Sequence, residues 1–163
     1  MSAEQISEMV LDLYAARSEA REYLDFFVSP DIEKKLDKSR SLIKKEMSRN
    51  SKGRNKSRST RIRRFIKDIS SLNPGTEPVA EIMTFAVEAF CEVGSDQIIK
   101  TSVQNGYARL LHDTIIYIND AGLVGDYLPR IEKAVDSMSS SWWRGNEFKK
   151  LLKQELKETM ESL

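Results

Sequence analysis

Residues 77–93 read EPVAEIMTFAVEAFCEV, and this stretch decides the fold class. Its apolar residues recur every three or four positions, which is the spacing of one face of an α-helix. Pro78 is tolerated in the first turn of a helix, and Gly94 follows the stretch as a C-terminal stop signal. The pattern therefore predicts a helix that begins near Glu77 and ends at Val93.

The same periodicity continues along the rest of the chain, in segments that turn signals separate. Further helices are expected at about residues 2–16, 18–28, 30–47, 59–72, 95–118, 126–138 and 146–160. No segment alternates with a period of two, so no sheet is expected. The predicted fold is all-α, a single helical domain over residues 1–163. It has seven or eight helices in antiparallel pairs, arranged as a helical bundle or a short solenoid-like stack of helical hairpins.

Short polar residues ahead of the apolar stripes predict the helix starts. Ser29, followed by a proline, is expected to cap the third helix, and Ser59 or Thr60 the fourth. Residues 95–96 are expected to cap the sixth helix, with a break near Gly106.

Charge is distributed very unevenly along the chain. The whole chain has 26 basic and 25 acidic residues, a net charge of +1. Residues 44–67 alone contain eleven basic residues and one acid, Glu46, so this segment carries +10. The candidate residues for binding an anion or a partner are Arg49, Lys52, Arg54, Lys56, Arg58, Arg61, Arg63, Arg64 and Lys67. Such polarity favours an anionic partner.

Residues 48–61 contain no apolar side chain at all. Burial cannot offset the entropy of ordering such a segment, and its like charges repel each other. We therefore expect a flexible basic loop at 48–61 within the helical domain.

Two kinds of anionic partner suit this segment: an acidic protein surface and a nucleic-acid backbone. Arginine makes planar bidentate contacts with carboxylate and phosphate alike. Phe65 is the only aromatic residue among the charges, and its place in the apolar stripe assigns it to the core. Single-strand binders interleave aromatic and basic residues, so any nucleic-acid binding is expected to be nonspecific. Trp142 and Trp143 are candidates for an aromatic contact with a partner or, alternatively, for packing against Phe148.

No residue pattern indicates catalysis, a cofactor or a metal. His112 is the only histidine and Cys91 the only cysteine, which excludes paired histidine or cysteine ligands. We expect His112 to be a hydrogen-bonded histidine and Cys91 a packed small side chain. Glu4, Glu8 and Asp12 align on one face of the first helix, where they are solvated or meet the basic segment. Neither a nucleophile elbow nor a glycine-rich phosphate loop occurs.

The cellular location is expected to be cytoplasmic. No run of about 18 apolar residues occurs, and the residues after Met1 lack the regions of a secretion signal. No membrane partner is expected. A homo-oligomer is compatible with the charges, because the acidic face of the first helix complements the basic segment of another copy.

Several landmarks follow one another along the chain. They are Leu11-Asp12-Leu13-Tyr14, Tyr23-Leu24-Asp25-Phe26 before Pro30, the helix from Ile62 to Ile69, and the turn from Trp143 to Gly145. In this order the chain resembles a family of uncharacterised bacterial all-helical proteins, known only as a domain of unknown function. The resemblance covers most of the chain and implies the helical fold. It implies no activity and no functional residue.

These observations predict a non-enzymatic cytoplasmic helical interaction module with a basic arm for an anionic partner. The alternative is nonspecific nucleic-acid binding through residues 44–67.

Overall fold

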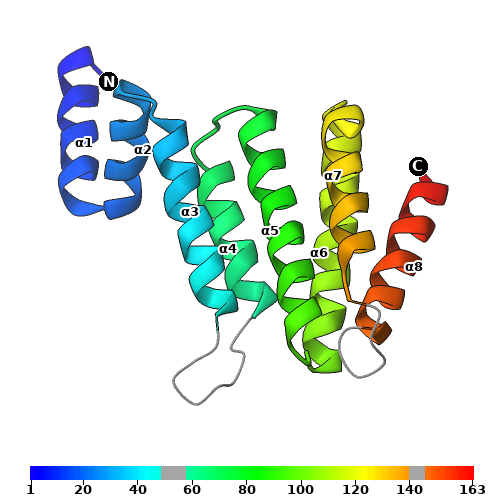
Figure 1. Ribbon diagram of the computed structural model, residues 1–163. Coiled ribbons are helices and arrows are strands. Elements are labelled where there is room, and N and C mark those ends of the chain that lie inside the picture. The colour runs from blue at the N-terminus through cyan, green and yellow to red at the C-terminus, as the bar shows by residue number, and fades with distance from the viewer. Residues whose placement is uncertain (49–57, 140–145) are drawn as a thin grey trace. The chain divides into compact units, whose positions relative to one another are not determined.

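The computed structural model describes residues 1–48, 58–139 and 146–163, and all eight elements within them are helices, as predicted (Figure 1). The helices are α1 (Ala3–Ala16), α2 (Ser18–Val28), α3 (Ile32–Met47), α4 (Ser59–Ser70), α5 (Thr76–Asp96), α6 (Thr101–Asp120), α7 (Val124–Ser137) and α8 (Asn146–Ser162). The chain divides into two compact units, residues 1–34 and residues 35–163. None of the helices in these ranges is both long and apolar enough to cross a membrane.

In the first unit, α1 and α2 form a helical hairpin (Figure 1). The Tyr14 hydroxyl on α1 donates a hydrogen bond to Asp25 Oδ1 on α2 at 2.9 Å. Arg21 Nε donates to the Tyr14 carbonyl oxygen at 3.2 Å, across the turn. Neither helix contains a buried residue, so these polar contacts join two helices that share no closed core.

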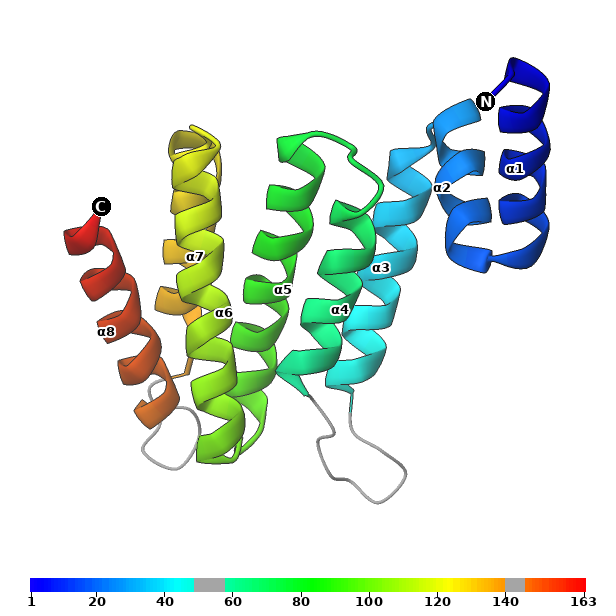
Figure 2. The same ribbon diagram turned by 180° about the vertical axis from the view of Figure 1, so that it is seen from behind.

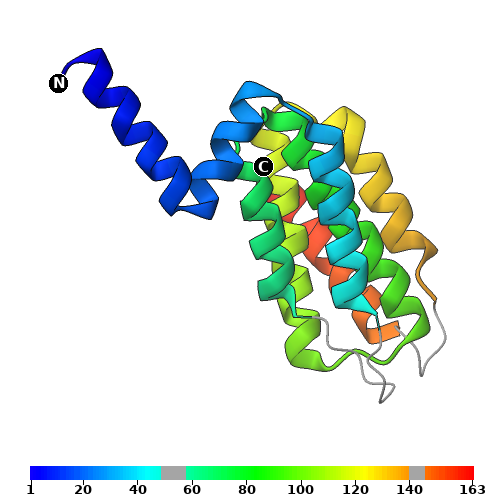
Figure 3. The same cartoon turned by 90° about the vertical axis from the view of Figure 1, so that its left-hand side faces the viewer.

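In the second unit, successive helices alternate between two layers. α3, α5 and α7 form one layer, and α4 and α6 lie in the other (Figure 3). Figure 2 looks onto the second layer and shows α8 beside α6, against which it packs. α5 packs most extensively against α7, and α6 against α8. Consecutive helical pairs therefore pack on one another in a bundle-like arrangement.

α5 lies at the centre of this unit, and eleven of its residues are buried. Phe90 of α5 stacks on Tyr107 of α6, with ring centroids 4.8 Å apart. Phe148 of α8 lies 6.1 Å from Phe90, so one aromatic cluster joins three helices. Burial raises the pKa of the Cys91 thiol in the same helix, which is the packed side chain that its apolar surroundings predicted.

Gly94 was predicted to end a helix and Gly106 to interrupt one, but both lie inside helices. α5 continues past Gly94, where a Cβ atom would lie 2.7 Å from Phe148 Cδ1 and 2.9 Å from Met138 Cε. α6 is continuous through Gly106, where a Cβ atom would lie 2.3 Å from Ser59 Oγ. Both predictions were wrong because these glycines allow neighbouring elements to approach closely, and they do not reverse the chain.

The predicted helix starts also need correction. Asp31 rather than Ser29 caps the N-terminus of α3, because Asp31 Oδ1 accepts a hydrogen bond from the Lys34 amide at 3.1 Å. α6 begins at Thr101, since residues 95–96 still belong to α5. α4 begins at Ser59, within the segment predicted as a loop, and residues 49–57 of that segment lie outside the described residues.

Candidate anion-binding surface

Five of the nine predicted anion-binding residues lie on α4 or directly before it. They are Arg58, Arg61, Arg63, Arg64 and Lys67. The other four, Arg49, Lys52, Arg54 and Lys56, fall in residues 49–57 and so lie outside the described ranges. Trp142 and Trp143 lie outside them as well.

α4 separates apolar and basic side chains cleanly. Ile62, Ile66 and Ile69 are buried, at 0%, 7% and 2% exposure. Arg61, Arg64 and Lys67 recur every three residues and are exposed. At about 1.5 Å of rise per residue, these three cations extend over roughly 9 Å of the helix axis. Burial of the isoleucines therefore holds the cations in a fixed row.

Two arginines of α4 already contact carboxylates of neighbouring helices. Arg61 Nη1 lies 3.0 Å from Glu46 Oε2 of α3, and the Glu46 side chain is only 9% exposed. Arg63 pairs with Asp113 of α6. These two pairs join α4 to α3 and to α6.

The remaining cations are available to a partner. Among the described residues, Arg58, Arg64 and Lys67 form no ion pair, and all three are exposed. The one acid of α4, Asp68, is exposed on the same helix and reduces their combined charge only in part.

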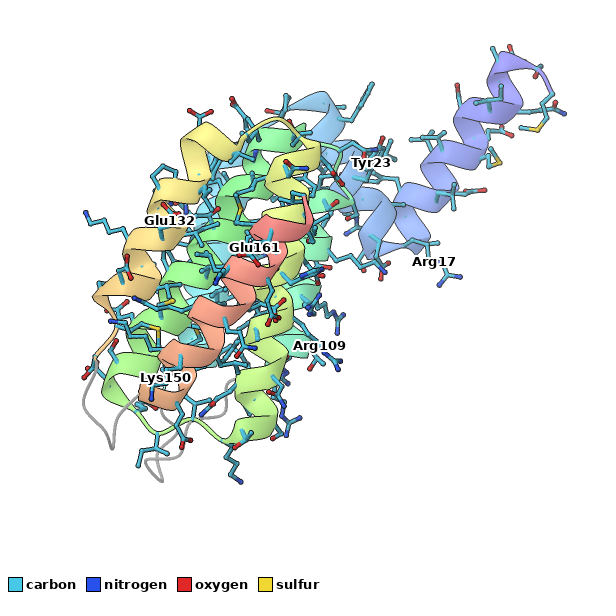
Figure 4. All side chains as sticks on the ribbon, turned by 90° about the vertical axis from the view of Figure 1, so that its right-hand side faces the viewer. Arg17, Tyr23, Arg109, Glu132, Lys150 and Glu161 are labelled. Atoms are coloured by element: carbon cyan, nitrogen blue, oxygen red, sulfur yellow. The ribbon has the colours of Figure 1, made fainter. Side chains whose placement is uncertain are left out.

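Arg109 of α6 extends the row, and sequence reasoning missed it. It lies between Gly106, which receives Ser59 of α4, and Asp113, which pairs with Arg63. Figure 4 shows the exposed Arg109 at the edge of α6, where nitrogen-bearing side chains gather. No local signal marked this residue, because it follows α4 by about forty positions and joins it only through helix packing. We call Arg58, Arg61, Arg64, Lys67 and Arg109 the basic surface.

The start of α4 adds positive potential to the basic surface. The first turn of α4 has no acidic residue, and its N-terminus has no side-chain cap. Helix N-termini carry a partial positive charge, so acids are favoured there and cations are disfavoured. Arg61 lies in this first turn, where a positive charge destabilises the helix. Residues that reduce local stability in this way are typical of binding sites.

Phe65 differs from its prediction. It is half-buried rather than part of the closed core, and lies four residues after Arg61 at the border of the apolar stripe. Beside the basic surface, a groove of about 270 Å³ between α4 and α6 is lined by Arg63, Lys67, Asp113 and Tyr117 among others. Pockets for small ligands are usually larger and more enclosed, so the surface suits an extended partner better.

The other candidate groups do not form a second site in the part of the chain that the structure describes. His112 Nδ1 lies 3.0 Å from Thr159 Oγ1 and 3.1 Å from Glu155 Oε1, which joins α6 to α8. No cluster of three potential metal ligands occurs in the ranges that the structure describes. Glu4, Glu8 and Asp12 are exposed on α1, as their spacing predicted.

These features define an all-helical protein of packed helical pairs with a basic face on its fourth helix. The chain belongs to a family of unknown function, DUF6155, whose model matches residues 1–155. The predicted membership of an uncharacterised all-helical family is thereby confirmed. No curated protein matches the chain, and no solved structure matches it.

Proposed function

We propose that this chain is a non-enzymatic helical interaction module of the cytoplasm, and that its basic surface binds an acidic protein partner. The observation that carries the proposal is the row of exposed cations on α4, of which Arg58, Arg64 and Lys67 have no ion-pair partner among the described residues. Arg58 and Arg61 lie at the N-terminal end of α4, where the helix dipole disfavours cations, and both are exposed. An external anion explains this placement better than folding does.

The contacts of the neighbouring arginines favour a carboxylate as the anion. Arg61 and Arg63 already pair with carboxylates of the same chain, so acidic side chains can reach the guanidinium groups of this helix. An acidic helix or loop would extend the same pairing to the free cations. Rim charges of this kind raise association rates and specificity more than affinity.

Nonspecific nucleic-acid binding is the second candidate. It is supported by the net charge of +10 over residues 44–67 and by the partial exposure of Phe65 beside the arginines. Phosphate contacts would dominate this binding, so it would be strongly salt dependent and indifferent to base sequence.

Fluorescence anisotropy at several salt concentrations tests both candidates, with a labelled polyglutamate peptide and a labelled DNA duplex as probes. The test variant replaces Arg58, Arg61 and Arg64 by glutamine. The control replaces Lys133, Lys150 and Lys157, three exposed lysines on α7 and α8, and removes the same charge.

We expect the acidic peptide to bind at low salt, and the test variant to weaken it at least tenfold while the control does not. Duplex binding with a salt slope near −4, flattened by about one unit for each arginine removed, would replace the leading proposal by the second. Absence of binding to both probes at low salt would reject both.

A further inference from the structure

A groove between α4 and α6 has an apolar floor. α4 and α6 are neighbours in one layer of the second unit, and α5 of the other layer packs against both (Figure 3). The floor consists of Ile66 from α4, Val79 and Met83 from α5, and Leu110 from α6. Each of these side chains is at most 8% exposed, so the core of the second unit holds the floor in place. We call this feature the α4–α6 groove.

The rim of the α4–α6 groove is polar and has an excess of positive charge. Arg63 of α4 pairs with Asp113 of α6, so these two charges compensate each other. The Tyr117 hydroxyl donates to the Thr76 carbonyl oxygen at 3.5 Å. Lys67 also lines the groove, is exposed, and forms no ion pair within the described ranges. The uncompensated charge of the rim is therefore that of Lys67.

The volume of the groove suits one side chain of a partner. It measures about 270 Å³, which is below the roughly 300–1,000 Å³ of most ligand pockets. A cavity of about 150 Å³ with apolar walls is already large enough for benzene. One aromatic side chain therefore fits in the groove, and a larger ligand would extend beyond it. Burial of an apolar group against this floor is favourable, because it removes apolar surface from water.

Lys67 links the groove to the basic surface. Arg64 precedes Lys67 by three residues, which corresponds to about 4.5 Å along the helix axis. Arg64 is exposed and likewise forms no ion pair in the part of the chain that the structure describes. A segment that places a side chain in the groove thus has its neighbouring residues within reach of both cations. Carboxylates on those neighbours would complement the charge, whereas lysine or arginine there would be repelled.

The apolar floor and the two cations together narrow the chemistry of the partner. A nucleic-acid backbone pairs with the cations but has no apolar side chain for the floor. An uncharged apolar segment fills the groove but leaves both cations unpaired. A segment with an aromatic residue beside acidic residues satisfies both requirements. Aromatic residues are also common anchors of protein interfaces, where they fill pockets of this kind.

We propose that the α4–α6 groove binds one aromatic side chain of the acidic protein partner, and that carboxylates beside this residue pair with Lys67 and Arg64. The inference rests on the proposed function and adds to it the class of partner sequence, an acidic segment with an aromatic anchor. The anchor contributes affinity because it leaves water, and the carboxylates orient the segment.

Three labelled peptides test the inference by fluorescence anisotropy. One is polyglutamate, and the other two contain a single phenylalanine or a single alanine at its centre. We expect the phenylalanine peptide to bind the natural chain at least about tenfold more tightly than the alanine peptide, because the ring becomes buried. Lys67→Gln should weaken the binding of both peptides, since it removes a charge and leaves the floor intact.

Two serine variants locate the bound ring. Ser70 is the last residue of α4, is exposed and lines the groove, so Ser70→Trp fills the groove from its rim. Ser137 is the exposed last residue of α7, and Ser137→Trp is the matched control. Ser70→Trp should abolish the preference for phenylalanine over alanine, and Ser137→Trp should retain it. Circular dichroism of each variant controls for folding.

Methyl NMR of the natural chain provides a measurement that needs no variant, and it decides the inference if Ser70→Trp does not fold. The ring of the phenylalanine peptide should shift the methyl signals of Val79 and Leu110, which line the groove. The alanine peptide should leave them unchanged. The buried Ile131 of α7 is the control, and neither peptide should shift its methyl signals.

Equal affinities of the phenylalanine and alanine peptides for the natural chain would overturn the inference. The proposed function would then still stand, because polyglutamate would bind through charge alone. A preference for phenylalanine that Ser70→Trp does not reduce would also overturn the inference, since the ring would bind elsewhere. Absence of binding by all three peptides would reject the proposed function and the inference with it.

Discussion

α1 and α5 have the same kind of apolar periodicity, but they have opposite environments. Eleven residues of α5 are buried, whereas α1 has none. The apolar side chains of α5 meet α4, α6, α7 and α8, which come from the same compact unit. An apolar stripe on a helix thus indicates that this face is to be buried, but it does not indicate which surface buries it.

The largest contrast is expected between two phenylalanines. Phe90→Ala should lower the free energy of unfolding of the second unit by about 3–5 kcal/mol, because it empties the centre of an aromatic cluster. Phe27→Ala, at a ring that is 76% exposed, should change that value by less than about 0.5 kcal/mol. Chemical denaturation monitored by tryptophan fluorescence measures both. Equal midpoints would show that the core is not centred on Phe90.

A smaller effect is expected where the core has no space to add atoms. Gly94→Ala should destabilise the protein by about 1–3 kcal/mol, because the new Cβ would clash with Phe148 and Met138. Gly125→Ala is the matched control on α7, where nothing lies within 4 Å of a new Cβ. It should stabilise the helix by up to about 1 kcal/mol. Thermal unfolding of both variants tests whether α8 approaches α5 this closely. A Gly94→Ala protein more stable than the natural chain would contradict this close approach.

The free energy of unfolding should depend on pH through an ion pair at the partly exposed edge of the core. Arg130 Nη1 donates to Glu81 Oε2 at 2.6 Å, and this hydrogen bond lowers the pKa of Glu81. A carboxyl whose pKa is lower in the folded state stabilises the fold above its unfolded pKa, about 4.3, and this contribution is lost as pH falls through the folded value. The natural chain should therefore lose stability on acidification below about pH 5.

Arg130→Met should lower the free energy of unfolding at pH 7 by about 1 kcal/mol and reduce its acid dependence, because Glu81 loses its main partner. Lys153→Met, which breaks the more exposed pair with Asp136, should have a smaller effect. Urea unfolding at pH 7 and pH 3 measures both variants. An unchanged acid dependence in Arg130→Met would exclude this pair as its source.

The smallest effect concerns the hairpin itself. The hydrogen bond to Asp25 and the charge of that carboxylate raise the pKa of Tyr14. Asp25→Asn should return the Tyr14 pKa toward its usual range, because the charge disappears. A titration of ¹³C-labelled tyrosine followed by NMR measures it, with Tyr117 as the control ring. A Tyr14 that titrates identically in both proteins would mean that α1 and α2 do not pair in solution.

The sequence located the charged segment of the candidate site but not the contacts that its residues make. Composition identified the basic segment, and the helical spacing predicted Arg61, Arg63, Arg64 and Lys67 on the solvent-exposed face of α4, where Arg63 is instead half-buried and paired with Asp113. It could not identify the carboxylates that occupy Arg61 and Arg63, or add Arg109 from α6. Those relations join residues 15 to 50 positions apart, and only helix packing creates them.

The sequence by itself determined the all-helical class, because a 3.6-residue period needs no information beyond neighbouring residues. It determined the apolar stripes and the polarity of charge for the same reason. Only the tertiary structure decided the roles of Gly94 and Gly106, since a glycine reads the same at a helix end and at a close contact between helices. The tertiary structure also decided that the stripe of α5 is buried and that of α1 is not, because burial depends on which surface arrives from elsewhere.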